Sequence, residues 1–216
     1  MRIVLLGAPG AGKGTQCKNI VARYRLQHLS SGDILRRNRS AGTDLGKKAQ
    51  SYMDAGDLVP DRIIIDMMSE AIKKAPPVGF VLDGFPRTVN QARELDKSLA
   101  GDGDIDAVVN LRIDDSVVQA RMTGRRSCPK CGAVYHIENL KPKTEGVCDH
   151  DGTRLVQRPD DTPEVVANRL ETYHRQTEPL VDHYRKNGTV FDIEADRDPE
   201  EVKACVFEKL QTLVKL

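Results

Sequence analysis

A glycine-rich loop between an apolar run and a helix-forming segment restricts the fold more than any other feature of this sequence. Residues 3–6 are apolar, and residues 7–15 read GAPGAGKGT. Glycines let several backbone N–H groups turn toward one anion, and the N-terminus of a following helix adds partial positive charge. Lys13 can reach the β- and γ-phosphates of a nucleoside triphosphate. We therefore predict that this loop binds a triphosphate through Gly10, Ala11, Gly12, Lys13, Gly14 and Thr15.

One departure from the usual phosphate-loop pattern concerns the metal that accompanies a triphosphate. The pattern places Ser or Thr directly after the lysine, where its hydroxyl contacts Mg²⁺. Here Gly14 follows Lys13, and the hydroxyl comes one position later, at Thr15. Direct ligation of Mg²⁺ by this loop is therefore not expected from the pattern.

Segments typical of buried strands alternate with segments typical of helices along the chain. The expected strands are residues 3–6, 27–29, 79–83, 107–112 and 189–193. The expected helices are residues 13–25, 33–38, 46–55, 61–74, 88–99, 116–124 and 199–213, with a long helix that begins after Thr162. This alternation predicts an α/β fold with a parallel five-stranded sheet flanked by helices. Ligands of such sheets bind at the carboxyl ends of the strands, where Gly7 and Asp83 are expected.

Composition excludes several classes of protein. The 216 residues carry a net charge of +1 and only 4% aromatic side chains, which offers little surface for tracking nucleic acid. No run approaches the roughly 18 apolar residues of a membrane span, and the N-terminus lacks the pattern of a secretory signal. An odd number of cysteines, five, argues against a disulfide framework. These features predict a cytoplasmic protein without nucleic-acid or membrane partners.

Three of the cysteines occur close together in a manner typical of a metal site. Cys128, Cys131 and Cys148 are followed at the same two-residue interval by Asp151, giving C-x2-C-x16-C-x2-D. Tetrahedral Zn²⁺ accepts thiolate, imidazole and carboxylate ligands. Spacing favours Asp151 as the fourth ligand, with His150 and the more distant His136 as alternatives. Four protein ligands leave no open position, so we expect a structural ion that holds together a segment too short to bury a core.

Further motifs identify a family resemblance. They are SSGDILR at residues 30–36, GDLV at 56–59, DGFPR at 83–87 and RPDD at 158–161. Together with GAPGAGKGT and the cysteine spacing, they resemble adenylate kinases of the long-lid bacterial type with a zinc-bearing lid. The resemblance extends from Met1 to about residue 184. It implies a P-loop nucleoside monophosphate kinase with a core (residues 1–29, 60–123 and 162–216), a helical monophosphate-binding insertion (30–59) and a small β lid (124–161).

The resemblance also implies a reaction and a partner set. A member of this family transfers a phosphoryl group reversibly from MgATP to AMP, giving two ADP, and acts as a monomer. The alternatives are a kinase for UMP, CMP or GMP, or an ATP-switched module that contacts nucleic acid through a zinc ribbon. The cysteine-rich lid and Gln91 favour adenylate over the other monophosphates.

Residue roles follow by matching positions. The catalytic clamp would comprise Lys13, Arg87, Arg125, Arg158 and Arg169, because guanidinium groups grip phosphate oxygens and stay charged. ATP would also contact Arg121, Val134, Tyr135 and Arg197. AMP would contact Ser31, Arg36, Asp57, Leu58, Val59, Gly84, Phe85, Pro86, Arg87, Gln91, Arg158 and Arg169. Asp83 would hold Mg²⁺ through water, and Asp160 and Asp161 would position lid arginines. Arginines outside the motifs, such as Arg175, are expected at the surface.

Overall fold

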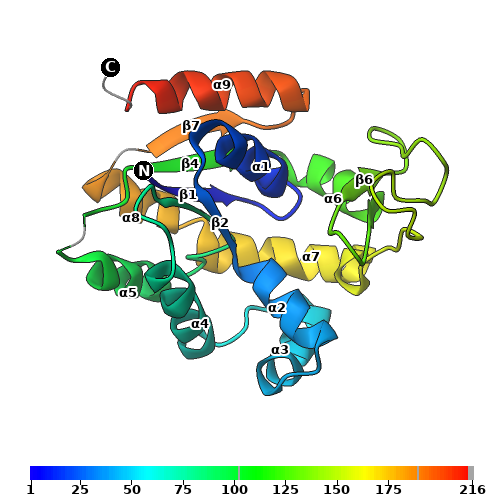
Figure 1. Ribbon diagram of the computed structural model, residues 1–216, viewed down its shortest axis with the longest axis horizontal. Coiled ribbons are helices and arrows are strands. Elements are labelled where there is room, and N and C mark those ends of the chain that lie inside the picture. The colour runs from blue at the N-terminus through cyan, green and yellow to red at the C-terminus, as the bar shows by residue number, and fades with distance from the viewer. Residues whose placement is uncertain (102, 189, 214–216) are drawn as a thin grey trace.

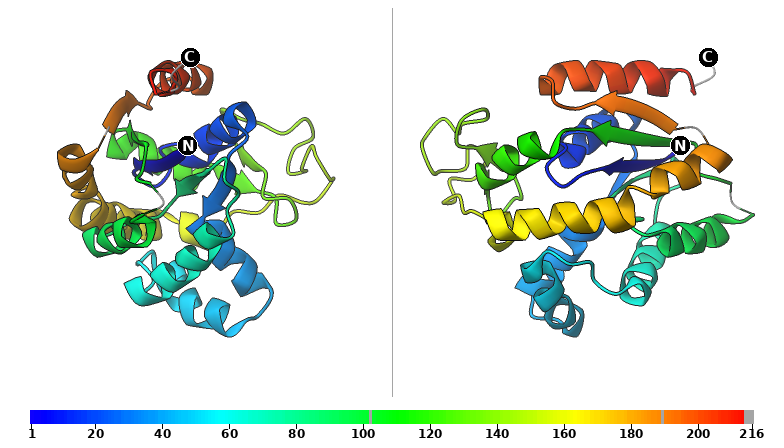
Figure 2. Two further views of the ribbon diagram at one scale, coloured as in Figure 1. Left: turned by 60° about the vertical axis from the view of Figure 1, so that its left-hand side comes forward. Right: turned by 180° about the vertical axis from the view of Figure 1, so that it is seen from behind.

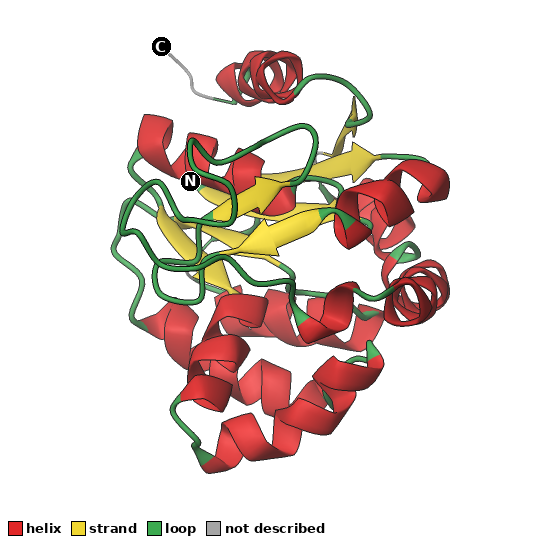
Figure 3. Cartoon of the chain, turned by 90° about the vertical axis from the view of Figure 1, so that its right-hand side faces the viewer, coloured by secondary structure: helices red, strands yellow, loops and turns green. Residues whose placement is uncertain are grey.

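Five parallel strands form the centre of the molecule. The computed structural model describes residues 1–101, 103–188 and 190–213, and its main sheet has the order β2-β3-β1-β4-β7. The strands are β1 (Arg2–Gly7), β2 (Gln27–Ser30), β3 (Phe80–Asp83), β4 (Ala107–Arg112) and β7 (Val190–Glu194). Leu5 of β1 pairs with Asp83 on one side and Val109 on the other, in parallel register. The predicted parallel five-stranded sheet is confirmed (Figure 3).

Helices cover both faces of this sheet because successive strand residues point in opposite directions. Ile3 and Leu5 pack in one apolar cluster, whereas Val4 and Leu6 pack in another. The first cluster lies beneath α1 (Lys13–Tyr24) and α9 (Pro199–Gln211). The second is covered by α4 (Asp61–Lys73), α5 (Val89–Leu99) and α8 (Leu180–Asn187). Figures 1 and 2 show these two helical layers on either side of the strands.

A pair of short helices, α2 (Ser31–Ser40) and α3 (Asp44–Ala55), projects from the carboxyl end of β2 (Figure 1). Each begins about two residues before its predicted start, because side-chain caps satisfy its first backbone donors. The Ser30 hydroxyl accepts from the backbone N–H of Asp33, and the Thr43 hydroxyl accepts from that of Gly46. A Cβ at Gly46 would lie 2.4 Å from the backbone of Asn38, so glycine permits the close approach of the two helices.

The small β unit predicted for the cysteine-bearing segment is confirmed. Strands β5 (Arg125–Ser127) and β6 (Val134–His136) are antiparallel, and Ser127 also bridges Val156. Helix α6 (Asp115–Thr123) leads into this unit, and a 3-10 turn (Pro159–Asp161) leads out of it to α7 (Pro163–Thr172). Its buried hydrophobic cluster consists of Cys128, Ala133, Tyr135, Cys148 and Leu155.

The chain after Thr162 differs from the single long helix that the sequence predicted. Helix α7 ends at Thr172, a π-helical turn covers Tyr173–Thr177, and α8 starts after Pro179. Pro179 lacks the N–H of a continuous helix and separates the two segments. The last helix ends at Gln211, two residues before its predicted end, and Thr189 of the predicted last strand lies outside the described residues. In the part of the chain that is described, no helix is long and apolar enough to cross a membrane.

Candidate active site at the carboxyl edge of the sheet

The predicted phosphate loop connects β1 to α1. Gly10 and Gly12 adopt φ angles of +76° and +93°, in the left-handed region that glycine enters without strain. A Cβ at Gly10 would lie 2.9 Å from the Met122 side chain, so the loop also packs closely on α6. The Lys13 ammonium donates to the carbonyl oxygens of Gly7 (2.6 Å) and Ala8 (2.8 Å).

The charge state of Lys13 depends on its surroundings. Burial, together with the nearby Arg87, Arg169 and Arg125, lowers the pKa of Lys13 to about 7, although Asp83 opposes the shift. An anionic ligand favours the protonated form of a lysine whose pKa has been lowered, so its binding would raise this pKa again. The loop therefore combines inward-turned backbone, a helix N-terminus and a lysine, which together suit a polyphosphate.

Asp83 ends β3 beside this loop, as expected. It pairs in register with Leu5 of β1, and a Cβ at Gly14 would lie 3.8 Å from its Oδ2. On the other side His28 Nε2 lies 3.3 Å from the same oxygen. A carboxylate at this position can hold Mg²⁺ through water, since Mg²⁺ retains several of its waters in proteins.

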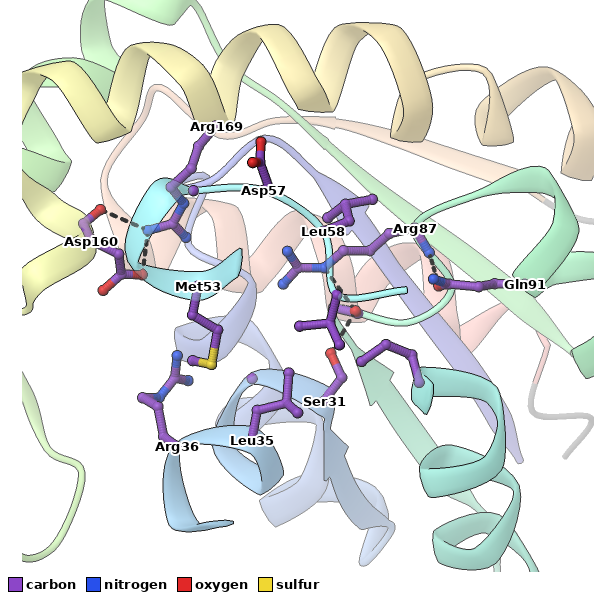
Figure 4. A pocket seen from close by; sticks show the side chains of 15 residues that line it. Ser31, Leu35, Arg36, Met53, Asp57, Leu58, Arg87, Gln91, Asp160 and Arg169 are labelled. Carbon is purple, nitrogen blue, oxygen red and sulfur yellow. Dashed lines mark hydrogen bonds and ion pairs between the residues drawn. The ribbon is translucent and has the colours of Figure 1, made fainter. Parts of the chain in front are cut away.

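A pocket beside Asp83 gathers most of the residues predicted to bind a monophosphate (Figure 4). It opens between α2, α3, the β3–α5 loop and α7. Of the predicted residues, it is lined by Ser31, Arg36, Asp57, Leu58, Val59, Gly84, Arg87, Gln91 and Arg169. Phe85, Pro86 and Arg158 do not line it, and Phe85 packs in the core.

The pocket is also lined by six residues that the motifs did not indicate as monophosphate contacts. They are Gly32, Leu35, Met53, Gly56, Ile64 and Asp160. Leu35, Met53 and Ile64 supply an apolar wall suited to a flat ring. An amphipathic helix pattern accounts equally well for all three, so the sequence alone does not distinguish a pocket wall from core.

Three guanidinium groups reach the pocket from three different elements. Arg36 on α2 pairs with Asp33 (2.6 Å), and Arg169 on α7 pairs with Asp160 (2.6 Å). Arg87, in the β3–α5 loop, donates from Nε to the carbonyl oxygen of Gly84 (2.8 Å). Burial lowers the pKa of Arg169 to about 10, although Asp160 opposes this shift. Partly buried guanidinium groups of this kind bind phosphate oxygens strongly.

The lid supplies two more arginines at the edge of this group. Arg125 donates through Nε and Nη2 to both oxygens of Asp161, which is fully buried, with an Nε–Oδ2 distance of 2.8 Å. Arg158 donates from Nε to the Ser127 hydroxyl (2.9 Å). Burial, together with nearby Arg125 and Arg36, lowers the pKa of Arg158 to about 10. Asp160 and Asp161 thus pair with arginines of the lid and α7.

Two of the residues predicted to contact AMP, Ser31 and Gln91, are held in place by neighbours. The Ser31 hydroxyl donates to the Gly84 carbonyl (2.6 Å). Gln91 is only 1% exposed, and its amide contacts Asp61 and the backbone of Arg87. Gln91 is therefore not an ordinary surface residue of α5. Its contact with a base stays a prediction.

Of the other residues predicted to contact ATP, Arg121 lies on α6, Val134 and Tyr135 lie on β6, and Arg197 follows β7. Arg121 on α6 donates to the carbonyl of Ala195 (2.8 Å), which precedes the exposed Arg197 by two residues. Val134 is 38% exposed. The buried Tyr135 side chain points instead into the lid, where its hydroxyl accepts from the backbone N–H of Asp149 (2.8 Å). The Tyr135 hydroxyl is therefore engaged within the lid.

Four potential metal ligands converge in the lid. The donor atoms of Cys128, Cys131, Cys148 and Asp151 all lie within 4.8 Å of one another. The sulfurs of Cys131 and Cys148 are 3.5 Å apart, and Cys128 Sγ lies 3.5 Å from each Asp151 oxygen. Ligands of tetrahedral zinc at Zn–S distances of about 2.3 Å are separated by roughly 3.8 Å, so the set fits this ion.

The alternative ligands do not join this cluster. Among the described residues, the converging donor atoms include neither His150, which is exposed, nor His136. The His136 Nδ1 accepts from the backbone N–H groups of Glu138 (3.1 Å) and Asn139 (3.3 Å). The spacing argument for Asp151 is therefore supported by its position.

Comparison with known proteins agrees with this geometry. The family model described as "Adenylate kinase" matches residues 5–189. An adenylate kinase of Lachnospira eligens is 46% identical over 212 residues, covering 97% of this chain and all of that protein. One of Carboxydothermus hydrogenoformans is 48% identical over 98% of this chain and all of its own length. One of Caldicellulosiruptor bescii is 51% identical over 87% of this chain and 88% of its own length. From the site and these full-length similarities it follows that the chain belongs to the adenylate kinase family.

Proposed function

We propose that this protein catalyses reversible phosphoryl transfer from MgATP to AMP, giving two ADP. The observation that carries the proposal is the convergence of Arg36, Arg87 and Arg169 on one pocket beside the phosphate loop. These side chains come from three separate elements and place several cations where two phosphate groups would meet. Phosphoryl transfer needs this alignment and charge neutralisation more than it needs covalent help from the protein.

The proposed reaction is a direct displacement. An oxygen of the AMP phosphate forms a bond to the γ-phosphorus of ATP as the bond from that phosphorus to the β–γ bridging oxygen breaks. The bridging oxygen leaves with the β-phosphate, so each product is an ADP. The attacking phosphate is already anionic near neutral pH, and no general base is required. This fits a site made of arginines and a lysine rather than a nucleophile–base pair.

Each part of the chain has a proposed task. Lys13 and the backbone of residues 10–15 bind the ATP phosphates. Arg36 and Arg87 hold the AMP phosphate, and Arg125, Arg158 and Arg169 surround the group in transfer. Mg²⁺ bound with ATP neutralises charge on the β- and γ-phosphates. Asp83 would hold this ion through water.

The proposed reaction divides the chain into three units with different roles. Residues 30–59 act as the monophosphate-binding unit and residues 124–161 as a lid over ATP, with the rest as the core. A Zn²⁺ ion held by Cys128, Cys131, Cys148 and Asp151 would stabilise the lid without taking part in transfer. The protein would act in the cytoplasm as a monomer.

A substrate screen tests the proposal. Purified protein is mixed with MgATP and, separately, AMP, UMP, CMP or GMP, and diphosphate formation is followed by chromatography. Rapid ADP production with AMP and little product with the others is expected. A preference for another monophosphate would refute the adenylate assignment, and no transfer with any of them would refute kinase activity.

A further inference from the structure

The carboxylate of Asp61, the first residue of α4, accepts hydrogen bonds from side chains at the N-terminal end of α5. Its Oδ1 accepts from Gln91 Nε2 (2.7 Å). Its Oδ2 accepts from the Thr88 hydroxyl (2.9 Å) and from Asn90 Nδ2 (2.9 Å). The carboxylate does not line the pocket, whereas Gln91 does. Of Gln91, Thr88 and Asn90, Gln91 is the one that lines the pocket, so we expect an effect of Asp61 on a ligand to pass through Gln91.

The Gln91 amide is fixed at both of its ends. Its Oε1 accepts from the backbone N–H of Arg87 (2.8 Å), while its Nε2 donates to Asp61. A backbone N–H can only donate, and a carboxylate can only accept. If the amide turned by 180°, its NH₂ group would face the Arg87 N–H, and its oxygen would face the Asp61 carboxylate. Neither pair can form a hydrogen bond. The amide therefore has one orientation, which these partners determine.

The fixed amide retains part of its hydrogen-bonding capacity. A primary amide has two N–H donors and two acceptor lone pairs, and contacts with the described residues use one of each. One donor and one acceptor remain for the pocket, in an order that cannot reverse. Adenine carries an N–H₂ donor at position 6 and an acceptor at N1, whereas guanine carries an acceptor at position 6 and a donor at N1. An amide in one orientation can form two hydrogen bonds with one of these bases. With the other base it places donor against donor and acceptor against acceptor.

We propose that Asp61 is a positioning residue that makes the monophosphate site prefer adenine to guanine by fixing the orientation of Gln91. The inference rests on the proposed function and assigns the source of its base specificity. Without Asp61, Gln91 Nε2 loses its charged acceptor and the amide keeps only the Arg87 contact. The cost of turning the amide toward guanine then falls, because the repulsion between oxygen and carboxylate is gone.

The first test compares Asp61→Ala with Asn90→Ala. Both variants remove the hydrogen bond between Asn90 and Asp61, and Asp61→Ala also removes the acceptors of Thr88 and Gln91. The ratio of kcat/KM for AMP to that for GMP is measured, together with the melting temperature. The ratio should fall about tenfold or more in Asp61→Ala, mainly through a higher KM for AMP, as expected when a charged hydrogen bond is lost. Asn90→Ala should lose stability but keep the ratio; an equal fall in both variants would overturn the proposal.

A double-mutant cycle separates positioning from general stabilisation. If Asp61 acts through Gln91, then Asp61→Ala introduced into a Gln91→Ala background should leave the AMP-to-GMP ratio unchanged. A further fall in that background would show that Asp61 acts by another route. Asp61→Asn retains a carbonyl acceptor and should restore the ratio to between those of Asp61→Ala and the unmodified protein. No restoration would count against the proposal, and this variant also serves if Asp61→Ala is too unstable to purify.

The activity of the unmodified protein separates a failure of the proposed function from a failure of the role of Asp61. If it forms no ADP from AMP, the proposed function itself fails. If it uses AMP selectively and Asp61→Ala is equally selective, only the role of Asp61 fails.

Discussion

Replacement of Arg87 by alanine tests the proposed clamp most directly. Its guanidinium uses Nε to bind the Gly84 carbonyl, and neither Nη atom is hydrogen-bonded to a residue that the structure describes. Both Nη groups can therefore bind phosphate oxygens in the transition state. Loss of one preorganised donor of this kind lowers kcat by about 10²–10³, which corresponds to roughly 2.7–4 kcal/mol of transition-state stabilisation.

Folding should survive this substitution. The Gly84 contact contributes about 1 kcal/mol to stability, and its loss is partly offset because Arg36 no longer faces a second cation. Turnover is measured at saturating MgATP and AMP, and unfolding by calorimetry. Arg175→Ala is a matched control, since Arg175 is exposed and, among the residues that the structure describes, pairs only with Glu171 at 3.4 Å. Its turnover should therefore stay within about twofold. If Arg87→Ala turns over within about threefold of the unmodified protein, Arg87 does not belong to the clamp.

Three further predictions concern the phosphate loop and the lid. With a pKa of about 7 instead of 10.5, Lys13 is mostly neutral at pH 8, so binding of a non-hydrolysable ATP analogue should take up about 0.9 proton there and about 0.1 at pH 6. Titration calorimetry in buffers of different ionisation enthalpy measures this uptake, and a flat result between pH 7 and 9 would contradict it. Chelation of the lid metal should lower the melting temperature more than it lowers activity at moderate temperature; immediate and equal loss of both would argue against a purely structural ion. Asp151→Ala should weaken zinc retention by at least about tenfold while His150→Ala leaves it unchanged, as measured by competition with a chromogenic chelator; the reverse ranking would make His150 the ligand.

Local patterns in the sequence predicted the parts of the molecule that depend on local interactions. The phosphate loop depends on glycines and a lysine within one segment, so its position between β1 and α1 could be predicted. The same holds for Cys128, Cys131, Cys148 and Asp151, because two short turns bring each pair together. The predicted first residues of α2 and α3 were less accurate. The prediction followed the apolar pattern, whereas the helices begin directly after the caps Ser30 and Thr43.

Contacts between distant segments could not be predicted in this way. Asp61 and Gln91 are separated by 30 positions, and His28 and Asp83 by 55. Asp61 and Gln91 meet because α4 and α5 pack together with their first residues side by side. His28 and Asp83 meet because β2 and β3 are neighbouring strands. Neither member has a sequence signal that names its partner, since an aspartate at a helix start is also explained by the helix dipole. The sequence indicated Gln91 as a base-reading residue but did not indicate what orients it.

Partners of the arginines divide the clamp into two sets that can be perturbed separately. Arg36 is held by Asp33 within one helix, whereas Asp161 holds Arg125 through two hydrogen bonds and lies 3.7 Å from Arg169. Asp161→Asn replaces one acceptor by an amide N–H that faces the Arg125 guanidinium, so kcat should fall by roughly tenfold or more while the KM for AMP changes little. Asp33→Asn should do the opposite, raising the KM for AMP with kcat preserved, because it loosens only Arg36. Steady-state kinetics of both variants with AMP varied at saturating MgATP measure this contrast. If both variants change KM and kcat in the same proportion, the arginines act as one coupled network and the division into two sets is wrong.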